Sequence, residues 1–393
     1  MLFQTRMGKI FTIFVFFAAA MIALSCAPKD RVAESQLDTP EHHAYNGLKL
    51  LGEEKYADAQ REFELAIQLD SKYSKGYTGV GLVKIYTGDF DSAEDYLKKG
   101  WSKAKNDEDK VFVHVSRIRY YVQGQTKVEK KWLKSAINEF DDAMKLDPKY
   151  VPAYYFIGLA YKAGLEFNQA GQMFTKVLEF KSEYVAEADI QWNFIQKVQR
   201  AMPGTATGKQ IALVERLTRA DAAALFMEEF KIETLYKKRT PKTFDTSFKD
   251  PEKAATAAAA PVKITAKDIA SHPLRTDIEG ILKLGVRGLE NYPDGNFHPA
   301  EMVTRAAYAM MIEDILIKVS GDNALATKFI GTVSPFPDLR ADLPYFNAVM
   351  VVTSRGIMEA KDLTTAEFEP ISPVAGVDAL LIIRKFQGEL KFN

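Results

Sequence analysis

The chain has 393 residues, and its 52 Lys and Arg balance its 52 Asp and Glu, so the formal net charge is zero. This length suggests about two to three domains, and the charge balance excludes a general electrostatic attraction to nucleic acid. The single cysteine, Cys26, excludes an internal disulfide framework and any zinc or iron–sulfur site built from several cysteines. With five histidines in the whole chain, we expect no metal site and no cofactor.

The first 25 residues have the composition of a secretory signal. Arg6 and Lys9 precede an apolar run over residues 10–25. This run is short for a membrane-spanning helix, which needs about 20 apolar residues, and a basic start followed by a short apolar run is typical of a signal peptide. The alternative is an uncleaved N-terminal anchor with an incidental cysteine.

The residues Ala23-Leu24-Ser25-Cys26 resemble the cleavage box of bacterial lipoproteins, although Ala23 stands where that family prefers Leu. The resemblance implies a signal peptide at 1–25, lipid on Cys26 and a polar tether at 26–39. Three acyl chains would anchor the protein stably. Ala27 after the cysteine implies, by similarity to lipoprotein sorting in enterobacteria, the outer membrane with the protein facing the periplasm.

Small residues recur at fixed spacing through the first half of the chain. Gly47, Gly81, Gly124 and Gly158 are separated by 34, 43 and 34 residues. Each lies 12 residues before an alanine, and the alanines are Ala59, Ala93, Ala136 and Ala170. Apolar or small residues follow four and seven positions after each alanine, which is the spacing of one helix face. The pattern predicts pairs of antiparallel helices that pack closely through their small residues.

This pattern resembles the tetratricopeptide repeat, which implies a helical solenoid at 40–202. The expected units are 40–73, 74–107, 108–150 (with nine extra residues before its regular part) and 151–184, and a capping helix follows at 185–202. In that family the first helix of each unit lines a groove for a protein or peptide. The groove-facing candidates by position are Lys75, Tyr86, Tyr121, Tyr155 and Lys162. The alternative for each tyrosine is packing between units.

Turn-forming residues then interrupt the helical pattern, and we expect a linker at 203–210 between the solenoid and a second domain at 211–393. Within the second domain, the Lys-, Thr- and Ala-rich segment 237–263 predicts an irregular insertion, most simply a flexible one without function.

Two sequence patterns recur in this second domain. Tyr292-Pro293-Asp294-Gly295 predicts a tight turn, and Val303-Thr304-Arg305-Ala306 predicts the start of a helix. Leu217-Thr218-Arg219-Ala220 repeats that helix start, and Phe368-Glu369-Pro370 repeats Phe297-His298-Pro299. These segments resemble the S-layer homology motif, with a partial copy before about 240, a full copy at about 244–318 and a third at about 334–388.

The resemblance implies a helical bundle of three helix-loop-helix motifs with pseudo-threefold symmetry, whose grooves bind cell-wall or surface polysaccharide. It also implies that the arginine faces a carboxylate on the sugar, because a guanidinium clamps carboxylates bidentately. The third motif reads Ile371-Ser372-Pro373-Val374, and we expect Pro373 at its arginine position. The glycan-binding candidates are Arg219, Arg305, Tyr292, Asp294 and Gly295. The alternative is that the motifs only hold the bundle together.

No sequence pattern of a metalloprotease, P-loop, serine hydrolase or dinucleotide-binding enzyme is present. We therefore expect an all-α, non-catalytic envelope lipoprotein that tethers or scaffolds, with polysaccharide and a partner protein as its ligands and no nucleic acid. The alternative is an envelope assembly or secretion accessory factor in which both domains bind protein. An envelope enzyme with a disguised glycan-cleaving site is the third hypothesis.

Overall fold

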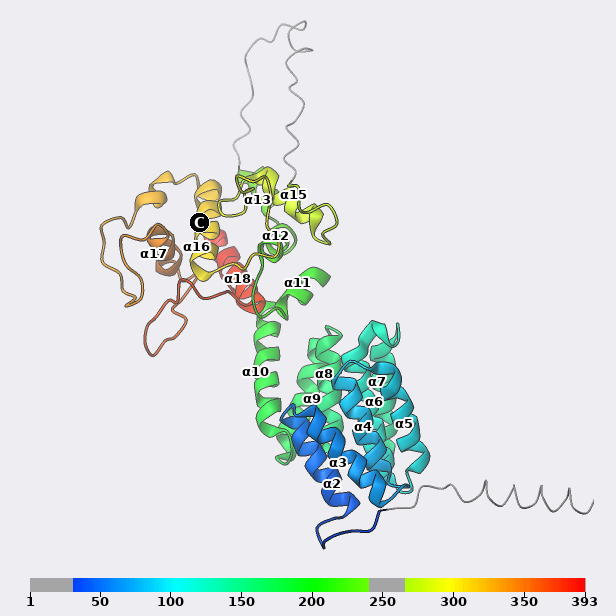
Figure 1. Cartoon of the computed structure of the whole chain (residues 1–393). Helices are drawn as coiled ribbons and strands as arrows, with labels where there is room; N and C mark the ends of the chain where they lie inside the picture. The colour runs from blue at the N-terminus through cyan, green and yellow to red at the C-terminus, as the bar shows by residue number, and fades with distance from the viewer. Residues whose placement is uncertain (1–30, 240–265, 393) are drawn as a thin grey trace, which may run out of the picture. The chain divides into compact units, whose positions relative to one another are not determined.

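The computed structural model describes residues 31–239 and 266–392, and every regular element in these ranges is a helix (Figure 1). The expected signal peptide, Cys26 and nearly all of the insertion at 237–263 lie outside the described residues. Among the helices described, none has both the length and the apolar composition to cross a membrane. The chain divides into two compact units, Met1–Trp192 and Asn193–Asn393. The division falls inside α10 (Val185–Ala201), before the linker expected at 203–210.

Antiparallel helix pairs build the first unit, and one pair falls in each expected repeat (Figure 1). The pairs are α2 (Pro40–Gly52) with α3 (Tyr56–Leu69), α4 (Ser74–Tyr86) with α5 (Phe90–Lys103), α6 (Asp107–Gly124) with α7 (Trp132–Leu146), and α8 (Val151–Ala163) with α9 (Phe167–Phe180). α6 has 18 residues where α4 has 13, and a short 3-10 turn follows it. The extra residues of the third repeat therefore lengthen its first helix and the next connection, instead of preceding them as expected.

The recurring small residues let the paired helices approach closely. Each of the four alanines of the pattern is fully buried. A Cβ added to Gly47 would lie 2.7 Å from the ring of Phe63, and one added to Gly158 would lie 2.7 Å from Phe174. Gly124 differs from the other glycines of the pattern, because it ends α6 and faces Val128. The glycine spacing thus predicts the helix pairs correctly but gives Gly124 the wrong role.

The second unit consists of short helices joined by long ordered loops. Its elements are α11 (Ala206–Ala212), α12 (Arg219–Ala224), the π-helical turn η2 (Leu225–Glu229), α13 (Ile232–Arg239), α15 (Arg275–Leu284), α16 (Arg305–Ser320), the 3-10 turn η3 (Asn323–Thr327), α17 (Phe346–Ser354) and α18 (Gly376–Phe392). α11 begins inside the expected linker. Two stacked pairs of aromatic rings join the segment around η2 to two later helices: Phe226 stacks on Tyr308 of α16 at 5.5 Å, and Phe230 stacks on Phe386 of α18 at 4.8 Å.

A ring of three backbone hydrogen bonds holds the three motifs together. Leu217 N–H donates to the carbonyl of Val374 at 2.7 Å, Val303 donates to Leu217 at 2.8 Å, and Val374 donates to Val303 at 3.1 Å. All three residues are buried. Each one stands two positions before the first residue of a helix, namely α12, α16 or α18. The ring gives the unit the pseudo-threefold arrangement expected from its sequence repeats.

This ring corrects the register of the third motif. Because Val374 is the counterpart of Leu217 and Val303, the counterpart of Arg219 and Arg305 is Gly376 and not Pro373. Gly376 follows Pro370 by six residues, just as Arg305 follows Pro299 by six, which agrees with this register. A Cβ on Gly376 would lie 1.7 Å from the carbonyl oxygen of Ile211 in α11. At this third junction α11 packs directly against the start of α18 and leaves no room for a side chain.

Candidate functional site

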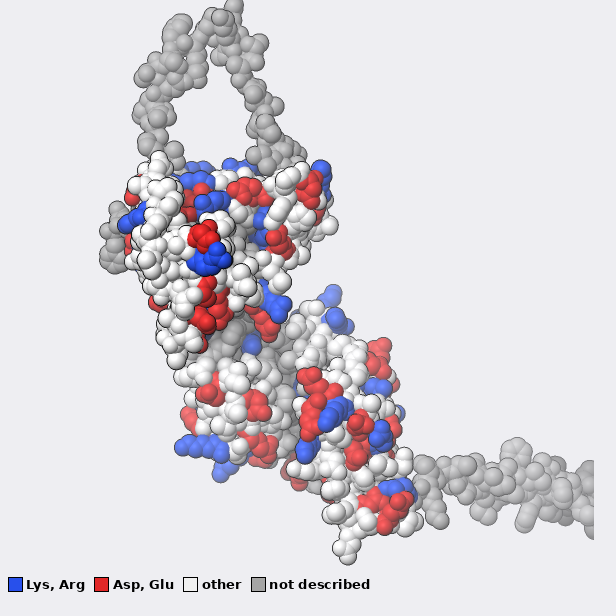
Figure 2. Space-filling model, turned by 60° about the vertical axis from the view of Figure 1, so that its left-hand side comes forward, with Lys and Arg blue, Asp and Glu red and all other residues white. Residues whose placement is uncertain are grey.

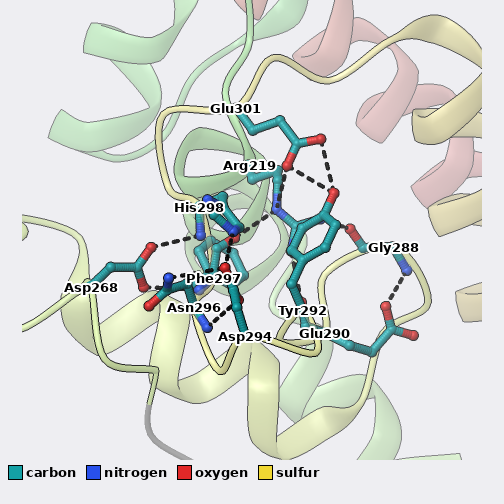
Figure 3. A network of polar contacts seen from close by, with 10 residues as sticks. All are labelled: Arg219, Asp268, Gly288, Glu290, Tyr292, Asp294, Asn296, Phe297, His298 and Glu301. Atoms are coloured by element: carbon teal, nitrogen blue, oxygen red, sulfur yellow. Dashed lines mark hydrogen bonds and ion pairs between the residues drawn. The ribbon is translucent and has the colours of Figure 1, made fainter.

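Arg219 is the best-defined candidate from the sequence, and its helix start explains its position. Thr218 caps α12 by accepting from the N–H of Asp221, whose carboxylate accepts in return from the N–H of Thr218. This reciprocal capping box fixes the first turn of the helix. It places Arg219 at the first helical position, where only 6% of its surface is exposed. Figure 3 shows the side chain among residues of the following motif.

The guanidinium of Arg219 binds backbone carbonyls of the next motif's loop. Nε donates to Phe297 at 2.9 Å, and the two amino groups donate to Gly288 and to Glu290, the latter at 2.7 Å (Figure 3). The guanidinium also lies 4.9 Å from the ring centre of Tyr292. Charged hydrogen bonds of this kind are strong when they are buried. Arg219 therefore fixes the loop that carries the other candidates.

Arg305 makes the corresponding contacts with the third motif. Its Nε donates to the backbone carbonyl of Phe368 at 2.6 Å, and one of its amino groups donates to the backbone carbonyl of Glu359 at 2.6 Å. Like Arg219, it is 6% exposed, and it lies over the Phe368 ring at 4.5 Å. Burial lowers the pKa of Arg305 from its ordinary value. Both arginines thus act between consecutive motifs, and their side chains face protein carbonyls.

Two aspartates that the sequence analysis did not select support the same loops. Asp268 accepts from the N–H groups of Phe297 and His298, both at 2.8 Å. Asp338 accepts from Phe368 at 2.9 Å and from Glu369 at 2.7 Å. The signal was present in the sequence, since each aspartate precedes its phenylalanine by about 30 residues. Although burial raises the pKa of Asp268, the two N–H donors lower it more, and the result is below the ordinary value.

The loop around Tyr292 is closed by its own short-range bonds. Asp294 accepts from the N–H of Asn296 at 2.8 Å and pairs with His298 at 3.0 Å (Figure 3). The N–H of Asn296 lowers the pKa of Asp294. Gly295 has φ +83°, a left-handed conformation that glycine adopts at low cost. The turn predicted from Pro-Asp-Gly is therefore present, and Asp294 and Gly295 are its conformational determinants.

The third motif has the same backbone conformation without the same residues. Ala366, two positions before Phe368, has φ +56°, as Gly295 does two positions before Phe297. Glu369 and His298 both have φ +54°. The sequence Thr-Ala-Glu-Phe therefore forms a loop of the same kind, although it lacks the Pro-Asp-Gly turn.

A surface hollow of about 520 Å³ adjoins the Tyr292 loop, and its lining comprises Asp268, Tyr292, His298, Pro299, Ala300 and Glu301. The hydroxyl of Tyr292 donates to the carboxylate of Glu301 at 2.8 Å, and burial together with Glu301 raises the pKa of Tyr292. Tyr292 is 40% exposed. An exposed ring beside carboxylates suits a ligand rich in hydroxyl groups, since carboxylates accept hydrogen bonds and rings pack against apolar C–H faces.

The structure places the five glycan-site candidates around two loops. Arg219, Tyr292, Asp294 and Gly295 surround the loop of the second motif, and Arg305 holds the loop of the third. Asp268 and Glu301 are additional residues at the first of these loops.

The first unit contains a larger, open hollow of about 600 Å³, lined mainly by side chains from the first helices of its pairs. Its lining comprises Leu48, Leu51, Gly52, Glu54, Tyr56, Tyr86, Phe112, Val115, Ser116, Arg119, Gln123, Tyr150, Pro152, Tyr155, Phe156, Leu159, Glu183 and Tyr184. Tyr86 and Tyr155 are thus brought together, as expected for groove residues. Tyr86 stacks on Tyr56 at 6.2 Å and Tyr155 stacks on Tyr184 at 4.7 Å.

The other three groove candidates lie outside this hollow. Tyr121 lines a separate one of about 400 Å³ together with Arg117 and Glu129. Lys75 pairs with Glu108, and Lys162 donates to Gln191 at 2.8 Å. Arg119, which the sequence analysis did not select, belongs to the large hollow, and its Nε donates to the hydroxyl of Tyr86 at 3.0 Å.

Charge and metal-ligand chemistry give no further site in the described part of the chain. Figure 2 shows Lys and Arg interspersed with Asp and Glu over the face drawn. Across residues 31–239 and 266–392, no group of three or more His, Cys, Asp or Glu is placed to hold a metal ion.

Two protein-family models match segments of the chain, one in each unit. The family model of the S-layer homology domain matches residues 267–309, and a model of the tetratricopeptide repeat matches residues 119–150. The chain combines tetratricopeptide repeats with an S-layer homology domain. Both are binding modules: the repeats indicate protein binding, and the S-layer homology domain indicates association with a bacterial cell surface or cell wall.

Two individual proteins are similar to part of the chain. Human tetratricopeptide repeat protein 6 is 27% identical over 141 residues, which is 35% of this chain. The chain spans about a quarter of that protein's length, since the match covers 25% of it. The solved structure of YrrB, described as a TPR protein with an unusual peptide-binding site, is 15% identical with a TM-score of 0.18, covering 38% of this chain and 90% of that one.

Proposed function

We propose that the chain is a non-catalytic lipoprotein of the bacterial outer membrane that faces the periplasm and acts as a tether or scaffold. In this proposal lipid on Cys26 holds one end, the S-layer homology domain binds cell-wall or surface polysaccharide, and the solenoid binds a partner protein. Two modest interactions on one anchored chain gain strength from effective concentration.

The hollow beside Tyr292 carries the polysaccharide part of the proposal. It offers a half-exposed aromatic ring, with the carboxylates of Asp268 and Glu301 beside it as hydrogen-bond acceptors. Arg219 supports the hollow by holding its loop at three carbonyls. Asp294 and Gly295 shape the same loop, and Arg305 has the role of Arg219 at the next motif. The third junction takes no glycan, because α11 fills it.

The aromatic hollow of the solenoid supports the protein-binding part. Tyr, Phe and Arg side chains are enriched where proteins bind one another, and here Tyr86, Tyr155, Phe156 and Arg119 line one hollow. Lys75, Tyr121 and Lys162 lie elsewhere on the same unit and form a wider contact surface in this proposal.

Sedimentation with purified wall polysaccharide tests the tether. The full chain, purified in detergent, should sediment with wall material from a bacterium that makes it, and Tyr292→Ala should reduce the bound fraction several-fold. Tyr45→Ala is the matched control, because Tyr45 is a 68% exposed tyrosine of the first unit. Wild-type protein that stays in the supernatant, or equal sedimentation of Tyr292→Ala, would rule out this glycan site.

The double variant Arg219→Ala, Arg305→Ala extends the test to both loops. It should bind less wall material than Tyr292→Ala, because it releases two loops rather than removing one ring.

Labelling with a fatty-acid analogue tests the anchor: incorporation should be lost in Cys26→Ser, and label that persists in this variant would show that Cys26 is not the lipidated residue. Membrane fractionation then assigns the label to the outer or inner membrane.

The alternative function is an envelope assembly or secretion accessory factor. It is favoured by the contacts of Arg219 and Arg305, because their guanidinium groups already donate to protein carbonyls and not to a sugar carboxylate. If both domains bind protein, co-purification from solubilised envelope should survive digestion of the wall glycan. Loss of all partners after that digestion would count against the accessory factor and for the tether.

A further inference from the structure

Arg119 lines the solenoid hollow and lies between two aromatic rings. Its guanidinium is 4.4 Å from the ring centre of Phe156 and 5.1 Å from that of Tyr86. Its Nε is occupied by the Tyr86 hydroxyl, while its two amino groups make no hydrogen bond or ion pair within the described part of the chain. The Arg119 side chain is therefore held in place by Tyr86 and Phe156, while its two amino groups can still donate hydrogen bonds.

The walls of the hollow add further donors. The Tyr86 hydroxyl accepts from Arg119, which leaves its own hydrogen to donate. Tyr155 and Tyr184 line the hollow, and their hydroxyls have no partner among the residues described. Burial raises the pKa of Tyr155 to about 12, and it raises that of Tyr184 against the opposing effect of Arg119. These hydroxyls therefore remain protonated donors at neutral pH.

Few hydrogen-bond acceptors line this hollow, and its carboxylates belong to exposed residues. The carboxylates that line the hollow are those of Glu54 and Glu183, and both residues are exposed. The rest of the lining is apolar or aromatic apart from Ser116, Gln123 and the groups described above, and the hydroxyl of Ser116 already donates to Phe112. A ligand that fits this hollow brings hydrogen-bond acceptors to Arg119 and the tyrosine hydroxyls, and apolar surface to the aromatic rings.

We infer that the hollow binds an internal, acidic segment of a partner protein, with a Glu or Asp side-chain carboxylate on the amino groups of Arg119 and an apolar neighbour against Tyr155 and Phe156. This inference rests on the proposal that the solenoid binds protein. A planar guanidinium pairs with a carboxylate through two parallel hydrogen bonds. The carboxylate of a Glu or Asp side chain stands off from the peptide backbone on an apolar stem. A C-terminal carboxylate lies directly beside its own backbone N–H, which would need an acceptor in a hollow with few acceptors.

A peptide library on the full chain tests the inference. The peptides are nine residues long and blocked at both ends, with Glu, Asp, Gln or Lys at the centre and random Leu, Phe, Tyr or Ser around it. Wild-type protein should retain peptides with central Glu or Asp about tenfold over those with Gln, as expected for charged hydrogen bonds. Arg119→Gln should reduce the ratio of acidic to Gln peptides retained to about one. Arg119→Lys should give an intermediate ratio, because lysine keeps the positive charge but cannot form two parallel hydrogen bonds with a carboxylate.

Arg117→Gln is the matched control, since Arg117 lies on the same helix but lines the other hollow and pairs with Glu139. It should keep the wild-type preference. A second library with a free C-terminus and no central acid tests the other source of a carboxylate. Its stronger retention would overturn the side-chain assignment.

The outcomes separate this inference from the function on which it rests. Peptides retained without any preference for acid, or a preference that Arg119→Gln leaves unchanged, would overturn the acidic ligand while the solenoid remains a peptide-binding module. No retention of any peptide would overturn both. Wall sedimentation depends on the other unit and is unaffected by either result.

Discussion

The Nε of Arg219 lies 2.9 Å from the carbonyl oxygen of Phe297, 78 residues further along the chain. Arg305 repeats this contact with Phe368 at 2.6 Å. Each bond joins the first helical residue of one motif to the loop of the next. The arginine of this motif is therefore a structural link between neighbouring motifs in this protein.

Replacing Arg219 by Ala should lower the free energy of unfolding of the second unit by roughly 3 kcal/mol, because several charged hydrogen bonds are lost and buried carbonyls are left unpaired. Arg305→Ala should cost less, about 2 kcal/mol, since it loses two such bonds. Urea unfolding measures both, and exchange of the Gly295 N–H reports the loop directly. Arg216→Ala, an exposed control, should change little; comparable losses in all three would contradict the assigned role.

Gly376→Ala should destabilise the second unit by at least about 2 kcal/mol, because the added Cβ would overlap the Ile211 carbonyl oxygen. Gly388 lies on the same helix, and a Cβ there would meet nothing within 4 Å. Gly388→Ala should therefore stabilise the unit by about 0.5–1 kcal/mol through helix propensity. Thermal unfolding of the two variants gives the comparison, and a shift of the same sign in both would argue against a closed third junction.

Ala366→Gly should stabilise the loop of the third motif by up to about 1 kcal/mol. Ala366 has φ +56°, a conformation that costs an L-residue roughly 1–2 kcal/mol, of which the greater flexibility of glycine in the unfolded chain cancels a part. The reverse change at the equivalent position, Gly295→Ala, should destabilise by a similar amount. Chemical denaturation of both variants checks the pair. If Ala366→Gly lowers stability, the left-handed backbone there is not a source of strain.

Asp268→Asn should cost about 1–2 kcal/mol at pH 7, because one of its two N–H donors loses a charged acceptor. The pKa of Asp268 is lower in the folded protein than in the unfolded chain, so its carboxylate stabilises the fold above about pH 4. That stabilisation is lost as the pH falls through the folded pKa, and the difference between wild type and Asp268→Asn should shrink there. Denaturation curves at pH 7 and pH 3 measure it, with Asp95→Asn, at an exposed aspartate of the first unit, as the control; an unchanged difference would contradict the sign.

Local sequence patterns predicted much of the architecture because they reflect local packing. The spacing of Ala59, Ala93, Ala136 and Ala170 predicts the helix pairs, and all four alanines are buried where the paired helices meet. The turn around Gly295 and the helix start at Arg219 were likewise visible, since capping and left-handed backbone depend on neighbouring residues.

The site could be predicted only in part, because its contacts join residues distant in sequence. The sequence analysis gives Arg219 a ligand because the three backbone carbonyls that it binds belong to a loop about 70–80 residues further along the chain. Arg119 was missed because its importance comes from Tyr86 and Phe156 on other helices. The sequence predicts the third motif out of register because Ile371-Ser372-Pro373 resembles Val303-Thr304-Arg305, although counting six residues from Pro370 leads to Gly376.

The hydrogen bonds that link Leu217, Val303 and Val374 use main-chain atoms alone. They require a residue other than proline and an apolar side chain that can be buried, and they use no atom of the residue two positions later. The junction at Gly376 therefore has the ring geometry without an arginine. The main-chain ring and the arginine links thus join the motifs through separate sets of hydrogen bonds, and the junction at Gly376 has the first set alone.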